Sequence, residues 1–112
     1  REVSAAKWIK TVQVQDRLAV DVLLDDLDLG EAETIVLARE LQADWVLMDE
    51  KKGRRKLDQL GMEKIGTLGL LLRSKQEGLI SAIRSDVDRL HRQGFGISQS
   101  VMKAVLEEAG EY

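Results

Sequence analysis

The stretch that decides the fold is residues 27–80, LDLGEAETIVLARELQADWVLMDEKKGRRKLDQLGMEKIGTLGLLLRSKQEGLI. Near its start, Asp28 stands three residues before Glu31, which is the spacing of a capping box at a helix N-terminus. Apolar residues then recur at helical spacing, at Ala32, Ile35, Ala38 and Leu41. This pattern predicts a helix over about residues 29–42.

An unbroken apolar run, Trp45-Val46-Leu47-Met48, follows and is too short for a helix. Such a run is typical of a strand that is buried on both faces. The pattern next predicts a helix over residues 51–60, a second short strand over 64–67 and a helix over 68–76. Alternation of helices and strands implies parallel strands with right-handed crossovers, so we expect a layered α/β fold in which helices flank a short parallel sheet.

The flanking sequence adds mostly helices. Before residue 27 we expect the end of a helix at 5–9, a short strand at 11–14 and a helix at 18–24. After residue 80, one helix carries Ile83, Val87 and Leu90, and Ser98 can cap a last helix with Val101, Val105 and Ala109. Because no proline, repeat or linker marks a boundary, we expect one domain over 1–112, with the helical pair of 81–112 packed on it as a C-terminal extension.

Composition limits the classes of function. The 112 residues include no cysteine, which excludes thiolate metal sites, and one histidine, which argues against a zinc site. Any metal must therefore have oxygen ligands, which Mg²⁺ and Mn²⁺ prefer. The net charge of -3 argues against coating of nucleic acid by bulk charge alone. No stretch is apolar for the roughly 20 residues that a membrane span needs, so we expect no membrane partner and a cytoplasmic protein.

Two acids are expected at the edge of the sheet where ligands bind. Asp49, with its neighbour Glu50, comes directly after the apolar strand, at its C-terminal end. Glu31 lies in the first turn of the preceding helix and shares a face with its apolar residues. A carboxylate at a helix start beside another at a strand end is an arrangement that holds Mg²⁺, which can activate water and stabilise charge on a phosphoryl group.

A cationic run stands next to these acids. After Glu50 the sequence reads Lys51-Lys52-Gly53-Arg54-Arg55-Lys56, with five cations in six residues. If the acids bind a metal, this run is placed to hold a phosphate backbone, and Gly53 would let that backbone approach closely.

Several of these pieces together resemble a branch of PIN-domain-like proteins, relatives of VapC-type toxins. The resembling residues, in this order and spacing, are Leu29-Gly30-Glu31-Ala32-Glu33, Leu47-Met48-Asp49-Glu50 with Gly53-Arg54, Ile65-Gly66-Thr67-Leu68-Gly69 and Gly78-Leu79-Ile80. The resemblance implies a PIN-like fold and a ribonuclease that depends on Mg²⁺ or Mn²⁺, often paired with an antitoxin. It assigns the catalytic and metal-binding acids to Glu31 and Asp49, with Glu33 and Glu50 as second choices. From the cationic run beside these acids we expect RNA binding by Lys51, Lys52, Arg54 and Arg55.

The chain departs from the family pattern at its N-terminus. The resemblance implies a first strand that carries an aspartate in the middle of the sheet, and residue 1 comes after that point. With this metal ligand unmatched, we expect weak or absent metal binding and an inactive 112-residue chain. A missing central strand would also leave residues 45–48 unpaired, which favours a homo-oligomer or strand exchange.

Each residue assigned a functional role above also has a simpler, structural explanation. Glu31 can serve only as the capping partner of Asp28, Glu33 as a helix-start charge, and Asp49 as a cap of the next helix with Glu50 in its first turn. The cationic run can be a solvated helix face, and residues 66–69 a strand-to-helix turn with a Thr67 cap rather than a phosphate loop. We expect Trp45 and Phe95 in or near the core and His91 at the surface.

Three functions remain open on this basis. The first is a metal-dependent ribonuclease. The second is a non-catalytic PIN-like interaction domain that dimerises or pairs with another chain. The third is a small helical binding module in which the two apolar runs are helical rather than strands.

Overall fold

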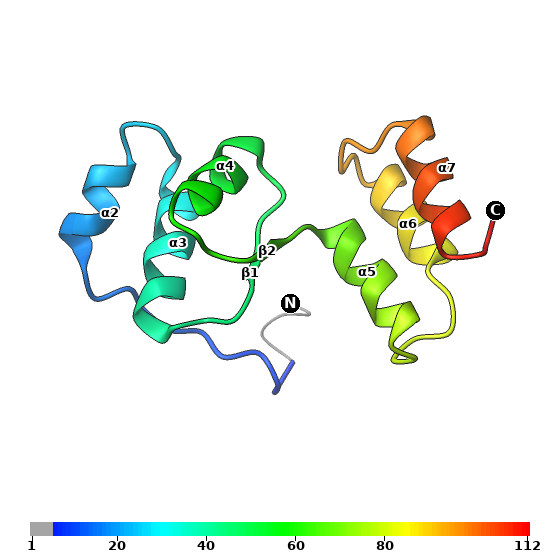
Figure 1. Cartoon of the computed structure of the whole chain (residues 1–112), viewed down its shortest axis with the longest axis horizontal. Helices are drawn as coiled ribbons and strands as arrows, with labels where there is room; N and C mark the ends of the chain where they lie inside the picture. Colours follow the sequence, from blue (N-terminus) through cyan, green and yellow to red (C-terminus); the bar gives the residue numbers. More distant parts are fainter. Residues whose placement is uncertain (1–5) are drawn as a thin grey trace. The chain divides into compact units, whose positions relative to one another are not determined.

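The computed structural model describes residues 6–112 and shows an α/β arrangement. The elements, in chain order, are α2 (Arg17–Leu23), α3 (Leu29–Leu41), β1 (Val46–Leu47), α4 (Lys51–Gln59), β2 (Lys64–Ile65), α5 (Thr67–Gln76), α6 (Arg84–Arg92) and α7 (Gln99–Glu108) (Figure 1). Strands β1 and β2 pair in a short parallel sheet. The predicted α/β class is therefore confirmed, and each of the two predicted strands contains a two-residue strand rather than a helix, although Thr67 already belongs to α5.

Contacts divide the chain into two compact units. The first unit ends at Lys64, and the second comprises Ile65–Tyr112. Each unit has its own cluster of buried apolar side chains, around Ile35 and Leu57 in the first and around Ile83, Val87 and Leu106 in the second. The expectation of a single domain over 1–112 stays a prediction.

The capping box predicted for the central helix is present at the start of α3. The Asp28 side chain accepts a hydrogen bond from the Glu31 N–H at 2.8 Å, and the Glu31 Oε1 accepts one from the Asp28 N–H at 3.1 Å. The helix ends where Gln42 adopts a left-handed conformation, with φ of 52°. The buried residues of α3 are Ala32, Ile35, Val36 and Ala38, whereas Leu41 is exposed.

The expectation that the first strand is buried on both faces was wrong. Val46 and Met48 are buried, but Leu47 is 51% exposed and Trp45, expected near the core, is 46% exposed. Successive side chains of a strand point to opposite faces, and within residues 6–112 the packing of α3 against β1 covers only one of them. The short apolar run is thus a half-buried strand.

Gly53 has a different role from the one expected. It is buried in α4, and a Cβ at this position would lie 2.5 Å from the Met48 Sδ and 3.0 Å from the Met48 Cγ. The absence of a side chain therefore lets α4 pack against the end of β1, where Met48 is 5% exposed. Gly53 is explained by this contact rather than by an approaching phosphate backbone.

Gly53→Ala should lower the free energy of unfolding by about 1–2 kcal/mol, measured by urea denaturation. Overpacking against Met48 costs about 1–3 kcal/mol, and the better helix propensity of alanine returns up to about 1 kcal/mol. Gly30→Ala is the matched control, because it also lies in a helix but its Cβ would meet only Asp28 Oδ1, at 3.6 Å. The control should be neutral or stabilising, and equal effects of the two substitutions would contradict the packing role of Gly53.

The structure contradicts some of the other local expectations and confirms others. Residues 11–14 form no strand in the described part of the chain, Thr67 is the first residue of α5 rather than its cap, and Phe95 is exposed. The helix end expected at 5–9 lies partly outside the described residues, and 6–9 are not helical. Ser98 caps α7 as predicted, with its Oγ accepting from the Val101 N–H at 3.2 Å, and His91 is exposed as predicted.

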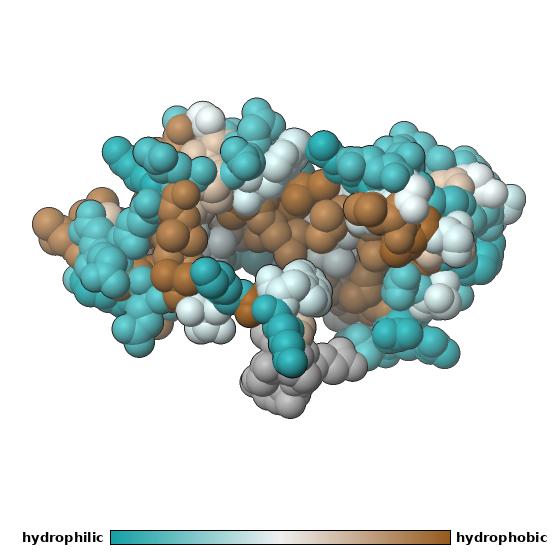
Figure 2. Space-filling view, turned by 90° about the horizontal axis from the view of Figure 1, so that it is seen from below, coloured by the Kyte–Doolittle hydropathy of each residue, from teal (hydrophilic) through white to brown (hydrophobic). Residues whose placement is uncertain are grey.

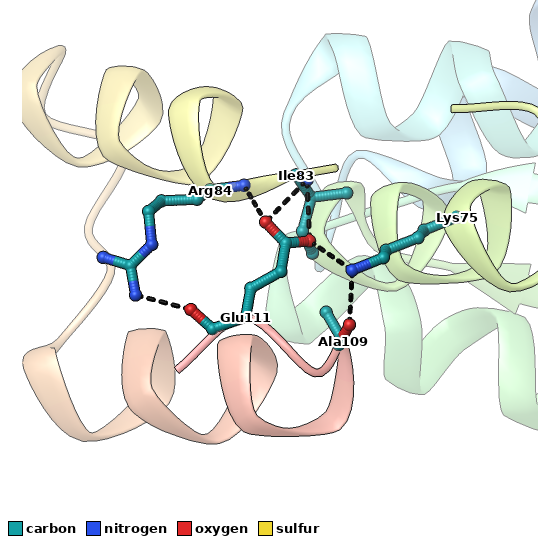
Figure 3. Close-up of polar contacts among 5 residues, drawn as sticks. All are labelled: Lys75, Ile83, Arg84, Ala109 and Glu111. Carbon is teal, nitrogen blue, oxygen red and sulfur yellow. Dashed lines mark hydrogen bonds and ion pairs between the residues drawn. The ribbon is translucent and has the colours of Figure 1, made fainter. Parts of the chain in front are cut away.

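In the second unit, the side chain of Glu111 links three segments by hydrogen bonds (Figure 3). Its carboxylate accepts hydrogen bonds from the Lys75 Nζ at 2.8 Å, from the Ile83 N–H at 2.9 Å and from the Arg84 N–H at 3.0 Å. The Lys75 hydrogen bond first, and then the bonds from Ile83 and Arg84, hold the pKa of Glu111 below its usual value against an opposing effect of burial. The carboxylate therefore stays ionised to lower pH than an ordinary glutamate, and it joins α5, the start of α6 and the end of α7.

Apolar side chains also remain at the surface of the first unit. Leu18 and Val22, one helical turn apart on α2, are exposed, and Figure 2 shows the brown, hydrophobic area at the left end of the view, where α2 lies. Between residues 6 and 112, no helix is both long and apolar enough to cross a lipid bilayer.

Candidate metal and RNA site

The two candidate acids belong to element ends at one side of the first unit. Glu31 is in the first turn of α3, and Asp49 follows the end of β1 after one intervening residue, Met48. Figure 1 draws the beginning of α3 and the C-terminal end of β1 toward the same, upper side of this unit, and α3 contacts both β1 and α4. This is the edge at which parallel α/β sheets bind ligands.

Glu31 is partly buried and already has a structural role. Its Oε1 is the acceptor of the capping box, so the predicted capping contact with Asp28 is confirmed. An ionised carboxylate nevertheless offers about four lone-pair positions on two oxygens, and the cap uses one of them. The cap thus orients the Glu31 side chain without exhausting its capacity to bind a cation.

Glu33 is committed to another contact. Its Oε2 accepts a hydrogen bond from the Arg17 Nη1 at 2.7 Å, in an ion pair between α2 and α3. Two residues along a helix correspond to a rotation of about 200°, so Glu33 points away from Glu31. Glu33 instead lines a hollow of about 570 Å³ together with Arg17 and Thr34.

The end of β1 carries a cation beside its acids. The Arg54 Nη1 donates to the Met48 carbonyl oxygen at 3.0 Å, and the Arg54 N–H donates to the Glu50 carbonyl oxygen at 2.9 Å. Glu50 is the N-cap residue of α4, and its side chain makes no capping hydrogen bond. Arg54 therefore fixes the strand end next to Asp49 and adds positive charge there, while Asp49 and Glu50 are exposed.

The rest of the cationic run faces a different neighbour. Lys52, Arg55 and Lys56 recur three and four residues apart on α4 and line a hollow of about 320 Å³. Asp25 and Asp26, from the turn between α2 and α3, line the same hollow, and the Lys56 Nζ lies 3.7 Å from the Asp26 Oδ2. The predicted RNA-binding residues thus divide into Arg54 at the strand end, exposed Lys51 at the helix start, and Lys52 and Arg55 in the hollow.

Asp25 and Asp26 have no functional role that the sequence alone predicts. The signal was the acidic pair itself, just before the capping aspartate, but only the fold brings it opposite α4. In the described residues, no group of three or more His, Cys, Asp or Glu side chains is close enough together to hold a metal ion. Glu31 and Asp49 therefore supply oxygen donors suited to Mg²⁺ or Mn²⁺ but not a complete coordination sphere.

The structure is thus an α/β fold in which the candidate metal-binding residues, Glu31 and Asp49, lie at the start of a helix and after the end of a strand. Residues 1–111 match a family model described as a PIN domain, and the chain belongs to this family. No curated protein and no solved structure matches the chain. The resemblance read from the sequence is thereby confirmed at the level of the family.

Proposed function

We propose that this PIN domain is part of a metal-dependent ribonuclease, with Glu31 and Asp49 as its metal ligands. The observation that supports the proposal most strongly is the position of these two acids, in the first turn of α3 and two residues after the end of β1, in a chain of the PIN-domain family. Asp49 is exposed, and the Glu31 carboxylate keeps lone pairs that the capping hydrogen bond does not use.

Each protein group has a part in this chemistry. A bound Mg²⁺ or Mn²⁺ would supply a Lewis acid that lowers the pKa of water and neutralises charge on a phosphodiester. The Asp28 cap orients Glu31, and Arg54 holds the end of β1 so that Asp49 follows at a fixed place. Lys51, Lys52 and Arg55 would bind the phosphate backbone of RNA. With two carboxylates, the site would hold such an ion weakly on its own, and the phosphates of the RNA would supply further oxygen ligands.

The test is cleavage of single-stranded RNA by the full-length protein under defined metal conditions. We expect cleavage with Mg²⁺ or Mn²⁺ and none after removal of divalent ions with EDTA. Restoration by Mn²⁺ but not by Ca²⁺ would match the preference of small, octahedral ions for a site with few carboxylates. Undiminished cleavage in EDTA would exclude the proposed metal chemistry.

A second candidate function is pairing with another protein chain, either a second copy or an antitoxin. It is favoured by a largely apolar hollow of about 660 Å³ between α2 and α3, which the exposed Leu18 and Val22 border. Such surfaces mark interaction sites more often than isolated apolar residues do. Light scattering and co-purification of a second polypeptide test this function, and a monodisperse monomer without a partner would contradict it.

A further inference from the structure

The hollow between α4 and the turn after α2 contains opposed charges at short range. Three cations of α4, Lys52, Arg55 and Lys56, face two carboxylates, Asp25 and Asp26, which leaves a surplus of one positive charge. The Asp26 side chain is 70% exposed and the Lys56 side chain 23% exposed. This contact is therefore a screened surface pair of small energy, which another anion can replace.

The acidic turn is held in place by the fold rather than by these charges. Leu27, the next residue, is buried in the core of the first unit. The N–H groups of Asp26 and Leu27 both donate to the Leu23 carbonyl oxygen, at 3.2 and 3.0 Å. Asp25 and Asp26 are thus presented to α4 by a fixed turn, and they would stay there when another anion arrives.

A carboxylate and a phosphodiester compete for the same donors. Both are anions whose oxygens accept charge-assisted hydrogen bonds from Lys and Arg. A phosphate that binds Lys52 or Arg55 in this hollow must replace the carboxylates as partner of these cations and bear the repulsion of the fixed acidic turn. Lys56 is already within ion-pair distance of Asp26.

We propose that Asp25 and Asp26 are an internal competitor for the phosphates of RNA, and that they set how tightly the cationic face of α4 binds RNA. The inference rests on the proposed RNA binding of this face. A polyanion that contacts several cations at once would overcome the competition, whereas a single phosphate would not. The two acids would thereby limit binding of small phosphates and favour a nucleic-acid strand.

The experiment measures binding of a fluorescent single-stranded RNA oligonucleotide by anisotropy, with the full-length protein in EDTA so that the probe stays intact. Asp25→Asn/Asp26→Asn should lower the Kd about 3- to 10-fold at low salt, since each exposed charge contact removed is modest. The matched control is Asp21→Asn/Asp44→Asn, which changes the net charge equally through exposed residues that do not line the hollow. It should change the Kd less than twofold, and inorganic phosphate should compete better with RNA in the first variant than in the wild type.

A second pair of measurements separates this inference from the proposed function. Lys52→Gln/Arg55→Gln should weaken RNA binding, and in that background the Asp25→Asn/Asp26→Asn change should no longer tighten it. If the wild type loses RNA on Lys52→Gln/Arg55→Gln but is indifferent to Asp25→Asn/Asp26→Asn, the internal competitor is refuted and the RNA site stands. If no variant binds RNA, or Lys52→Gln/Arg55→Gln binds as the wild type does, both are refuted. Unchanged circular dichroism would show that each variant is folded.

Discussion

Asp49→Asn should reduce kcat/KM for metal-dependent RNA cleavage by the full-length protein about 100-fold or more. Even groups that only orient a metal ligand contribute about 10- to 100-fold, so loss of a ligand charge should cost at least the upper value. Asparagine keeps the shape of the side chain and removes its charge, so the change acts on the cation rather than on packing. Because Asp49 is exposed, the fold should tolerate it.

Asp44→Asn is the control for this experiment. Asp44 precedes β1 as Asp49 follows it, and it is also exposed, but it lies at the opposite end of the strand. In a parallel sheet that end is remote from the ligand-binding edge, so activity should stay within about twofold of the wild type. Cleavage that is undiminished by Asp49→Asn, or equally reduced by Asp44→Asn, would discard the assignment of Asp49.

Leu57→Ala should lower the free energy of unfolding by about 2–5 kcal/mol in a urea titration. Leu57 lies in α4 with a side chain that is 0% exposed, within the core of the first unit. Its truncation removes apolar contact area and leaves a cavity among residues of α3 and β1 that cannot collapse freely. Such a loss is a large part of the total stability of a small domain.

Leu18→Ala provides the comparison, because Leu18 is a helical leucine that is 74% exposed. Its effect on the free energy of unfolding should be within about 0.5 kcal/mol. If the two leucines gave similar losses, Leu57 would not be part of the principal core.

Local signals explain why much of the secondary structure was predictable. The start of α3 is encoded by Asp28 and Glu31, whose side chains and N–H groups form a reciprocal capping box, and the start of α7 by Ser98, whose Oγ accepts a single hydrogen bond from the Val101 N–H. The burial of β1 was not predictable, because an apolar run does not show which faces find a partner. Gly53 was misread for a similar reason, since its partner Met48 comes from the end of the strand.

In the candidate site, too, the positions set by local sequence were predictable, and the contacts set by helix packing were not. Element ends can be predicted from the sequence, and the structure has Glu31 at a helix start and Asp49 after a strand, as expected. The Arg17–Glu33 pair and the acidic turn opposite α4 join segments that are far apart in the chain. Such pairs depend on how the helices pack, which periodicity alone does not specify.

The most direct test of the metal assignment is paramagnetic broadening by Mn²⁺ in an amide spectrum of the isotope-labelled full-length protein, with Mg²⁺ as the diamagnetic reference. One ion held by both carboxylates should broaden the amide signals near Glu31 and Asp49 together, at the same Mn²⁺ concentrations. Broadening around only one of these residues, or around neither, would contradict a shared cation site.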